Sequence, residues 1–336
     1  MVRLSDYDYF LPEGLIAQRP LEDRSASRLL VLPRNRGPVE HRRFVEVPSL
    51  LREGDLLVLN DTRVSALRLM GHKPTGAEVE ALLLSELDPG RFVALMRPGK
   101  RLRVGARVVF EDLAATVEAE LPQGQRQLKF DDHPSLAHRL REIGTVPLPP
   151  YIHEALADAE RYQTVIARTP GSAAAPTAAL HFTEALLDRL SEQGVKIATV
   201  TLNVGIDTFR PVEVEDLDRH SMHGEVCEVS EETAEAVAAC RGRIIAVGTT
   251  TTRTLETFAE GPRCLATGKR TSKLFIRPGY QWKVVEGMFT NFHLPKTTML
   301  MMLSALVGRE RLLDAYAEAV REQYRFLSFG DSMLVI

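Results

Sequence analysis

The stretch GDLLVLNDTRV, residues 54–64, decides the fold of this 336-residue chain. Its apolar run at residues 56–59 lacks any alternation with polar residues, which is typical of a strand buried on both faces of a parallel sheet. The next four residues are all polar: Asn60, Asp61, Thr62 and Arg63. Because ligands of open α/β sheets gather at the carboxyl ends of the strands, these residues are candidates for a binding site.

The sequence changes its pattern directly after this stretch, between about residues 66 and 131. Short β-like runs, such as EVEALLL at 78–84 and RFVALM at 91–96, alternate with turns such as KPTG and LDPG. Closely spaced short strands with Gly/Pro turns predict a small antiparallel barrel. A helix over residues 135–143 should follow, since Leu136, Leu140 and Ile143 have helical spacing and Gly144 supplies a stop.

The rest of the chain alternates strands and helices. We expect a helix over residues 183–194 with Thr183 as its cap, a strand at 196–202, a helix from Ser230, a strand at 244–247, a helix beginning near Arg253, strands at 274–276 and 283–285, one long helix over 298–324 and a final strand at 333–336. The sequence therefore predicts an α/β fold. An α/β sheet domain is built from both chain ends, residues 1–66 and 147–336, and an inserted β-barrel domain with its following helix spans residues 67–146.

Composition limits the class of protein. The chain is 44% apolar and 26% charged, as in ordinary globular proteins, and its longest apolar run, residues 299–307, is interrupted by Ser304. That run is far shorter than the ~20 residues that cross a membrane. The N-terminus lacks an apolar leader segment, and the three cysteines form no C-x-x-C pair. We therefore expect a cytoplasmic protein without a disulfide framework, a zinc site or any other metal site.

The net charge of −3 argues against bulk electrostatic coating of nucleic acid, but two local clusters are basic. The first contains Arg97, Lys100, Arg101, Arg103 and Arg107, and the second contains Arg24, Arg28, Arg34, Arg36, Arg42 and Arg43. Such clusters bind phosphates in many nucleic-acid-binding proteins. A solvated charged loop explains each of these clusters equally well.

A second polar segment at a strand end covers residues 248–252, which follow the expected strand at 244–247 and precede Arg253. A glycine, hydroxyls and a helix start can hold an anion with backbone N–H groups. The segment matches neither dinucleotide-binding nor P-loop motifs, and a Thr-capped helix start explains it as often.

Histidines supply the acid/base candidates. RHSMHGE brings His220, His223 and Glu225 together without the spacing of a metalloprotease, so a polar active-site loop or ordinary surface histidines are better interpretations than a metal site. His181 and His293 each precede an expected helix. Two histidines at such junctions are reasonable acid/base groups, although a single histidine is usually structural.

These stretches resemble the S-adenosylmethionine:tRNA ribosyltransferase-isomerase family. The likeness extends over nearly the whole chain, from DYDYFLPEGLIAQRP and RSASRLLVL through GDLLVLNDTRV, VPLPPYI, AAPTAALHFT, HSMHGE, AVGTTTTRTLE and VVEGMFTNFHLPKTT to YRFLSFGDSMLVI. No single motif is decisive, but so many motifs in order make coincidence implausible. The fold that the resemblance implies, an α/β/α sandwich with a small β-barrel, agrees with the fold read from the residues.

The resemblance implies an unusual use of S-adenosylmethionine, as ribosyl donor and not as methyl donor. The ribosyl moiety is transferred and isomerised onto 7-aminomethyl-7-deazaguanine at the tRNA wobble position, which gives epoxyqueuosine-tRNA, adenine and methionine. S-adenosylmethionine is then a substrate, and no cofactor is expected. The implied partners are S-adenosylmethionine and tRNA with a modified wobble guanine. We expect a monomer without a membrane partner.

We assign roles to residues as our own interpretation of this reaction. The acid/base candidates are His181, His223, Glu225 and His293, and Asp61 would orient one of them. Arg253 with Thr249 and Thr250 would hold the methionine carboxylate, because a guanidinium grips a carboxylate at two points. Further substrate-binding candidates are Asn60, Arg63, Thr183 and Asn291. The tRNA-binding candidates are Arg97, Lys100, Arg101 and Arg103.

The chain departs from the family pattern at two motifs. Where the family tends to have H-V-G-x-G-T-F, this chain has Asn203, Gly205 and Asp207 in N-V-G-I-D-T-F. The family proline of N-x-T-R-V-x-P-A-R is replaced within Ser65-Ala66-Leu67. An amide does not titrate near pH 7, so Asn203 cannot transfer a proton there.

Three alternatives follow. The first is a paralogue that uses S-adenosylmethionine with a different acceptor. The second is a methyltransferase, and the third is a non-catalytic tRNA-binding protein. A methyltransferase would have a Gly-rich loop after its first strand, where this chain has Pro33-Arg34-Asn35-Arg36. A pure binding module would leave the Thr, His and Asp residues at the strand ends unexplained.

Overall fold

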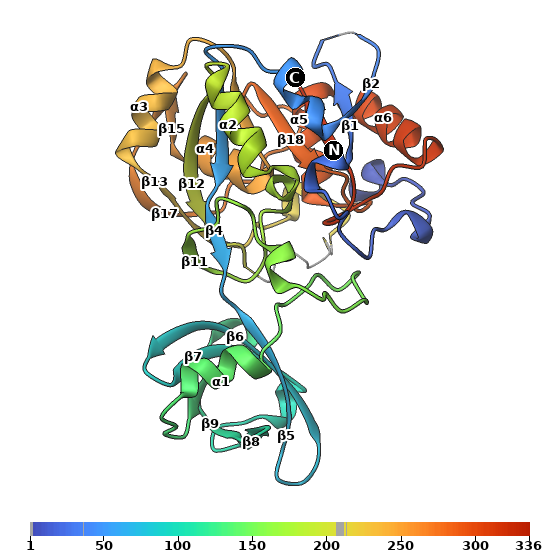
Figure 1. The fold of residues 1–336 in the computed structure, drawn as a ribbon. Helices are drawn as coiled ribbons and strands as arrows, with labels where there is room; N and C mark the ends of the chain where they lie inside the picture. Colours follow the sequence, from blue (N-terminus) through green and yellow to red (C-terminus); the bar gives the residue numbers. More distant parts are fainter. Residues whose placement is uncertain (1–2, 36, 206–211, 213) are drawn as a thin grey trace. The chain divides into compact units, whose positions relative to one another are not determined.

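The computed structural model describes residues 3–35, 37–205, 212 and 214–336, and the chain forms two compact units (Figure 1). One unit contains residues 1–62, 149–169 and 175–336, and the other contains residues 63–148 and 170–174. These limits differ slightly from the expected boundaries at 66/67 and 146/147. The difference has a local cause, because β4 (Thr62–Val64) pairs with β11 (Thr169–Ser172) where the chain passes between the units.

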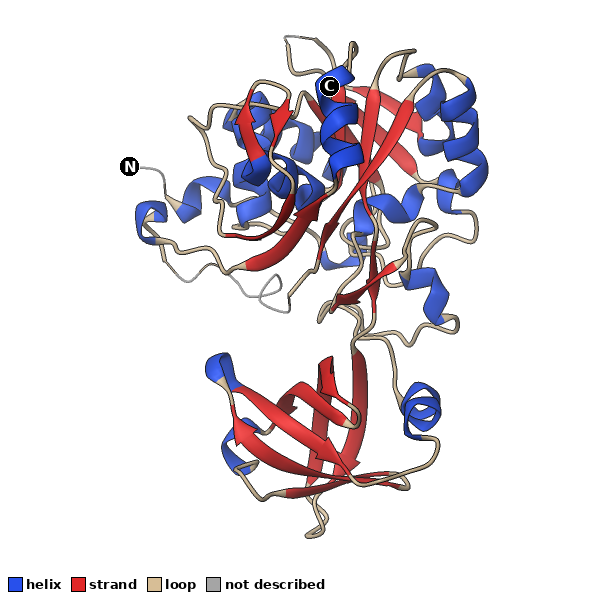
Figure 2. Ribbon diagram, turned by 90° about the vertical axis from the view of Figure 1, so that its left-hand side faces the viewer, coloured by secondary structure: helices blue, strands red, loops and turns tan. Residues whose placement is uncertain are grey.

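A nine-stranded sheet forms the centre of the larger unit (Figure 2). Its strands, in spatial order, are β17 (Gly268–Ser272), β13 (Glu225–Val229), β12 (Lys196–Leu202), β3 (Leu56–Asn60), β14 (Ile244–Val247), β18 (Gly287–Asn291), β19 (Ser332–Val335), β1 (Arg28–Leu32) and β2 (Glu40–Arg43). All five residues of β3 are buried, as the unbroken apolar run predicts.

Strand directions decide which loops meet. β3 runs parallel to β12 and β14, and β14 runs parallel to β18. β19 is antiparallel to β18 and parallel to β1, so β19 and β1 begin at the edge where β3, β12, β14 and β18 end. This edge, which we call the carboxyl edge, therefore collects segments from both halves of the chain.

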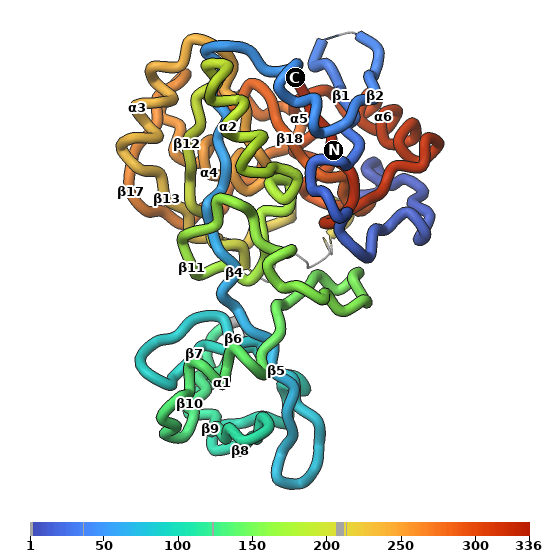
Figure 3. The backbone as a smooth tube through the Cα atoms, viewed as in Figure 1, coloured from blue at the N-terminus to red at the C-terminus, as the bar shows by residue number. Residues whose placement is uncertain are grey.

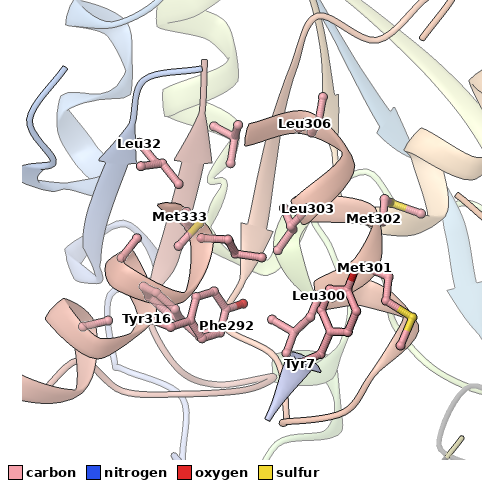
Figure 4. Packing of buried hydrophobic residues seen from close by; sticks show 14 of the residues in the cluster. Tyr7, Leu32, Phe292, Leu300, Met301, Met302, Leu303, Leu306, Tyr316 and Met333 are labelled. Carbon is pink, nitrogen blue, oxygen red and sulfur yellow. The ribbon is translucent and has the colours of Figure 1, made fainter. Parts of the chain in front are cut away.

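Alternate residues of the central strands face two separate apolar layers, which makes this unit an α/β/α sandwich as predicted. Leu30 and Leu32 join one cluster with α5 (Thr298–Val307) and α6 (Arg309–Arg321), whose close packing Figure 4 shows. Leu29 and Val31 join the other cluster with α2 (Glu184–Glu192). Burial of apolar surface on both faces stabilises the fold by about 25 cal/mol for each Å² removed from water, and it is the main stabilising contribution.

Several helices begin where the sequence predicts. Thr183 caps α2, since its hydroxyl accepts from Leu186 N at 3.2 Å, and Ser230 caps α3 (Glu231–Ala239) in the same way through Thr233 N. Helix α1 (Leu136–Ile143) follows the barrel strands and ends at Gly144. Figure 3 shows the first and last segments of the chain, coloured blue and red, together in the sheet unit, where β1 pairs with β19.

Four predicted elements differ from the structure. The long helix at 298–324 is two helices, because Gly308 adopts φ 84°, a left-handed conformation that ends α5. Helix α4 (Thr249–Phe258) begins one turn before Arg253. Residues 274–276 and 283–285 are not strands; the backbone N–H groups of Val284 and Val285 donate to the Glu256 carboxylate instead of to a sheet partner.

The smaller unit contains the predicted antiparallel barrel. Six strands close it in the order β10 (Gln125–Phe130), β7 (Arg91–Arg97), β6 (Glu78–Asp88), β5 (Leu67–His72), β8 (Arg107–Phe110) and β9 (Leu113–Glu120). Its interior contains Leu69, Val108 and Leu128, and Leu140 of α1 belongs to the same apolar cluster.

Shorter elements complete the described chain. A two-stranded sheet joins β15 (Ala259–Gly261) to β16 (Cys264–Leu265). The 3-10 helices are η1 (Leu4–Tyr7), η2 (Glu13–Leu15), η3 (Arg24–Ala26), η4 (Phe44–Ser49), η5 (Gly99–Arg101), η6 (Pro122–Gly124), η7 (Ala159–Tyr162), η8 (Thr177–His181) and η10 (Leu217–Arg219). In the part of the chain that the structure describes, no helix is long and apolar enough to cross a membrane.

Candidate active site

The polar segments identified in the sequence meet at the carboxyl edge of the sheet. Strands β12, β3, β14 and β18 end there at Leu202, Asn60, Val247 and Asn291. β13 is antiparallel to β12 and therefore begins at this edge, with Glu225. Neighbouring strands lie about 4.8 Å apart, so adjacent loops are within side-chain reach of one another.

Asn60 connects three of these loops. It is fully buried, its amide donates to Leu202 O at 3.0 Å and to Thr250 Oγ1 at 3.3 Å, and its carbonyl oxygen accepts from Leu202 N and Thr62 N, both at 3.1 Å. Thr62 Oγ1 then donates to Asn203 Oδ1 at 2.9 Å. Asn60 thus fixes the relative positions of the strand ends and has no donor or acceptor left for a substrate.

Asp61 is bound on both of its carboxylate oxygens. Arg168 Nε donates to Oδ2 at 2.9 Å and Thr201 Oγ1 donates to Oδ1 at 2.7 Å. None of the candidate histidines is among these partners in the described structure, so the expected orientation of a histidine by Asp61 stays a prediction. The reason is its position: β12 brings Thr201 beside Asp61, and the candidate histidines lie on other loops.

Gly248 and helix α4 form the segment expected to cradle an anion. Gly248 has φ 90°, a left-handed conformation in which a residue with a Cβ would be strained, although the space beside it is sufficient for a Cβ. Thr249 and Thr250 begin the helix, and Thr250 Oγ1 accepts from Asn60. The hydroxyls of Thr251 and Thr252 donate back to Val247 O and Gly248 O.

Arg253 is buried and paired with a residue of another strand. Its Nη1 donates to Glu225 Oε2 at 2.7 Å, and its Nη2 donates to Ser272 O at 3.3 Å. The side chains are only 9% and 2% exposed for Arg253 and Glu225. Pairing with Glu256 does not occur, since that carboxylate accepts from Tyr280 and the backbone of residues 283–285. Arg253 is therefore committed to Glu225 and does not offer an open two-point grip to a substrate carboxylate.

Glu225 is in turn held by Gly205 N, which donates to Oε1 at 3.0 Å, and approached by His223 Nε2 at 3.6 Å. Burial acts to raise the pKa of the Glu225 carboxyl. The approach of His223, the Arg253 charge and the Gly205 N–H group outweigh it, so that the pKa lies below its ordinary value. Glu225 is thus an ionised carboxylate next to a partly exposed imidazole. This carboxylate–imidazole pair is the arrangement that acid/base chemistry requires.

His181 has a different environment. Its Nδ1 lies 2.8 Å from Ser27 Oγ, its Nε2 lies 3.2 Å from Asn291 Nδ2, and Phe44 stacks on its ring with 5.0 Å between centroids. Burial, with the charges of Arg325 and Arg24, lowers its pKa to about 3. His181 is therefore neutral at pH 7. Because Asn291 also donates to Leu327 O, the amide nitrogen is the donor to Nε2, and the His181 proton lies on Nδ1.

His293 contacts β18 through its ring and α6 through its backbone. Thr290 Oγ1 lies 2.7 Å from its Nε2, and its backbone N–H donates to Tyr316 Oη at 3.1 Å. Burial lowers the pKa of His293 to about 4. The structure thus separates the candidate histidines: His223 has a charged carboxylate partner, whereas His181 and His293 are neutral hydrogen-bonding groups.

A small, partly open hollow lies at the carboxyl edge next to His181. Arg24, Arg161, Ser27, Ser328 and Phe329 line it together with His181, and no acidic residue is among its described lining residues. Sequence reasoning missed Ser27, Arg161 and Ser328 as site residues. They belong to three segments far apart in the sequence, and no spacing rule predicts that such segments meet.

The remaining candidates are dispersed. Thr183 serves as the cap of α2, and Arg63 belongs to the barrel unit. Asp207, which departs from the family pattern, and Arg36 of the second basic cluster lie outside the described residues. Among the residues that the structure describes, no group of three or more His, Cys, Asp or Glu side chains is arranged to hold a metal ion.

The basic residues of the barrel occupy the loop from β7 to β8. Arg97, Lys100, Arg101 and Arg103 are exposed, and within the described chain none of them lies in an ion pair. Arg107, by contrast, pairs with Asp131. Buried Arg126 fixes the loop from beneath, because it donates to Leu102 O at 3.0 Å and to Gly99 O at 3.2 Å.

The architecture is that of an α/β protein whose polar residues gather at one edge of a mixed sheet, with a second, barrel unit. A family model described as queuosine biosynthesis protein matches residues 4–335, and the chain belongs to that family. The recognition, the α/β fold class and the inserted barrel predicted from the sequence are thereby confirmed.

Individual relatives are similar over their full lengths. The chain is 52% identical to an S-adenosylmethionine:tRNA ribosyltransferase-isomerase of Symbiobacterium thermophilum, with 100% of both chains covered. It is 50% identical, with the same coverage, to the enzyme of that name from Pelotomaculum thermopropionicum. The crystal structure of an S-adenosylmethionine tRNA ribosyltransferase from Thermotoga maritima matches with a TM-score of 0.56 and 38% identity, over 98% of this chain and 100% of that one.

Proposed function

We propose that this protein transfers and isomerises the ribosyl moiety of S-adenosylmethionine onto 7-aminomethyl-7-deazaguanine at the wobble position of tRNA, and releases adenine and methionine. The observation that carries the proposal is the 52% identity to an S-adenosylmethionine:tRNA ribosyltransferase-isomerase over 100% of both chains. A methyltransferase or a simple tRNA-binding module would not account for this similarity along the whole chain.

The reaction requires a base near C5′ of S-adenosylmethionine, whose protons the adjacent sulfonium acidifies. His223 and Glu225 support this role best, because a buried carboxylate lies 3.6 Å from the imidazole Nε2. Small movements on substrate binding convert such a distance into a hydrogen bond. In this proposal the Nε2–H of His223 is directed at Glu225, and Nδ1 accepts the proton from C5′.

His181 and His293 have other roles in this proposal. Their lowered pKa values, about 3 and about 4, keep both rings neutral at pH 7. They orient neighbouring hydroxyls and do not supply a charged acid. Arg253 keeps Glu225 ionised and in place, and is therefore a positioning residue and not a ligand of the substrate.

The proposed substrates occupy different surfaces. S-adenosylmethionine binds at the carboxyl edge, near Thr249, Thr250 and Asn291, and phosphates of tRNA contact Arg97, Lys100, Arg101 and Arg103 of the barrel. The protein acts in the cytoplasm as a monomer, with S-adenosylmethionine consumed as a substrate and no further cofactor. Light scattering tests the monomer, for which we expect a mass of 37.4 kDa. Activity that survives a metal chelator is expected if no metal cofactor is needed.

The function is tested by incubating the protein with S-adenosylmethionine and tRNA that carries the aminomethyl-deazaguanine base, and measuring free adenine. We expect adenine release only with the modified tRNA, because the exocyclic amine is the nucleophile. The matched control is the same tRNA with guanine at the wobble position. Equal adenine release from both tRNAs, or S-adenosylhomocysteine as the product, contradicts the proposal.

A further inference from the structure

The hollow next to His181 is rich in hydrogen-bond donors and positive charge. Arg24 and Arg161 both line it. Burial, followed by the charge of Arg161, lowers the pKa of Arg24, as expected when two guanidinium groups lie close together. The charges of Asp158 and Glu160 act on Arg24 in the opposite direction. Among the described residues, however, neither guanidinium lies within 4 Å of a carboxylate oxygen.

Both arginines are held rigidly by backbone carbonyl groups, which leave part of each guanidinium unused. Arg24 donates to Gln163 O at 2.8 Å, to Leu180 O at 3.4 Å and to Glu160 O at 3.0 Å. Arg161 donates to Glu22 O at 3.0 Å and to Leu21 O. A guanidinium has five N–H donors, so about two remain on Arg24 and about three on Arg161.

Ser27 adds a third donor whose direction is fixed by the surrounding network. Asn291 donates to His181 Nε2, so His181 donates from Nδ1 to Ser27 Oγ at 2.8 Å. The Ser27 hydroxyl hydrogen must then point elsewhere, and its nearest protein acceptor, Arg24 O, is 3.5 Å away. Ser27 is only 2% exposed and lines the hollow, where a ligand oxygen would be a better acceptor.

From these observations we infer that the hollow is an anion site, in which Arg161, Arg24 and Ser27 bind the oxygen atoms of a carboxylate or a phosphate group. An anion there relieves the repulsion between the two guanidinium groups and uses their remaining donors. The site lies beside the end of β18, because His181 of its lining contacts Asn291.

The inference rests on the proposed function for the identity of its two ligand sources, the carboxylate of S-adenosylmethionine and a phosphate of tRNA. The hollow would also provide the contact to the substrate carboxylate that Arg253 does not provide, because Arg253 is paired with Glu225. Calorimetry with S-adenosylmethionine and with its decarboxylated analogue distinguishes the two sources, together with tRNA binding over a range of salt concentrations.

The variants are Arg161→Gln and Ser27→Ala, with Arg52→Gln as a control that removes an exposed arginine whose side chain is 70% exposed. If the carboxylate occupies the hollow, Arg161→Gln weakens S-adenosylmethionine binding about 10- to 150-fold and Ser27→Ala about 2- to 10-fold. Binding of the decarboxylated analogue stays the same. If a phosphate occupies it, S-adenosylmethionine binding is unchanged, and Arg161→Gln lowers the salt slope of tRNA binding by about one unit.

Two results overturn the inference. In the first, Arg161→Gln and Ser27→Ala bind every ligand as tightly as Arg52→Gln does. In the second, they lose the same affinity for S-adenosylmethionine as for its decarboxylated analogue. Thermal unfolding of each variant shows whether it is folded, and Ser27→Ala decides the outcome if Arg161→Gln is not. Adenine release by the wild-type protein is scored separately. Its absence would contradict the proposed function and leave the binding result intact.

Discussion

Arginine is used differently in the two units. Arg253 in the sheet unit is buried and donates to Glu225 and Ser272. In the barrel unit, Arg97, Arg101 and Arg103 are exposed and, among the described residues, have no carboxylate partner. The sequence alone makes Arg253 and the barrel arginines equal candidates to bind an anionic substrate.

The difference shows that a basic residue in a polar motif is not by itself a ligand site. The charge of Arg253 is compensated within the fold, where it stabilises the ionised form of Glu225. The barrel arginines carry uncompensated charge in water, which costs little and remains available to phosphates. Removing a charge should therefore lower stability at the Arg253–Glu225 pair and weaken tRNA binding at the barrel arginines.

The largest expected effect is that of Glu225→Gln. It leaves the Arg253 guanidinium buried without its counter-charge, so the free energy of unfolding should fall by about 3–5 kcal/mol. Urea denaturation measures this loss. Glu228→Gln, on an exposed position of the same strand, is the control and should change stability by less than about 0.5 kcal/mol. Equal stability of the two variants would show that the pair is not a structural unit.

Arg253→Lys should have the next largest effect. Lysine keeps the charge but cannot bridge Glu225 and Ser272 with a planar fork, so we expect a loss of about 1–3 kcal/mol in unfolding free energy. Affinity for S-adenosylmethionine in the folded variant should remain within about twofold of wild type. Normal stability with a tenfold or greater loss of affinity would instead return Arg253 to the role of carboxylate ligand.

The pH dependence of stability tests the neutral network around His181. The folded pKa of about 3 lies below the ordinary 6.5, so folding favours the neutral ring; this contribution is present above pH 6.5 and is lost as the pH falls toward 3. Between pH 7 and pH 5, wild type should lose about 2 kcal/mol more than His181→Gln. Parallel stability curves for the two proteins would contradict the assigned protonation state.

The smallest expected effect on the fold is that of Arg101→Ala with Arg103→Ala. Stability should change by less than about 0.5 kcal/mol, while tRNA binding weakens and its salt slope falls by roughly one unit per lost phosphate contact. Arg107→Ala, which removes an arginine already paired with Asp131, should leave the slope unchanged. An unaltered slope in the double variant would make this loop an ordinary solvated one.

Local patterns in the sequence predicted most of the fold. The unbroken apolar run before Asn60, the caps Thr183 and Ser230 and the turn-separated runs of the barrel all reflect chemistry within a few residues. The errors arose where one residue overrides such a pattern. Gly308 breaks a continuous helical periodicity, and the Glu256 carboxylate takes the backbone donors of Val284 and Val285 away from any sheet.

The site was less predictable, because its contacts are made between distant segments. Strand-end logic placed Asn60 and Thr250 at one edge, but it could not show that Asn60 is fully hydrogen-bonded or that Arg253 is occupied by Glu225. Ser27 and His181 are 154 positions apart, and only the pairing of β1 with β19 brings Ser27 to this edge. Side-chain partners of this kind require the register of the sheet.

Isotope transfer tests the central claim most directly. S-adenosylmethionine labelled in its ribose carbons, and a second sample labelled in its methyl group, are each incubated with the protein and tRNA bearing the aminomethyl-deazaguanine base. We predict that the ribose label enters the tRNA in equal amount to the adenine released, and that the methyl label leaves with methionine. Methyl label in the tRNA, with the ribose label retained in S-adenosylhomocysteine, would contradict the account.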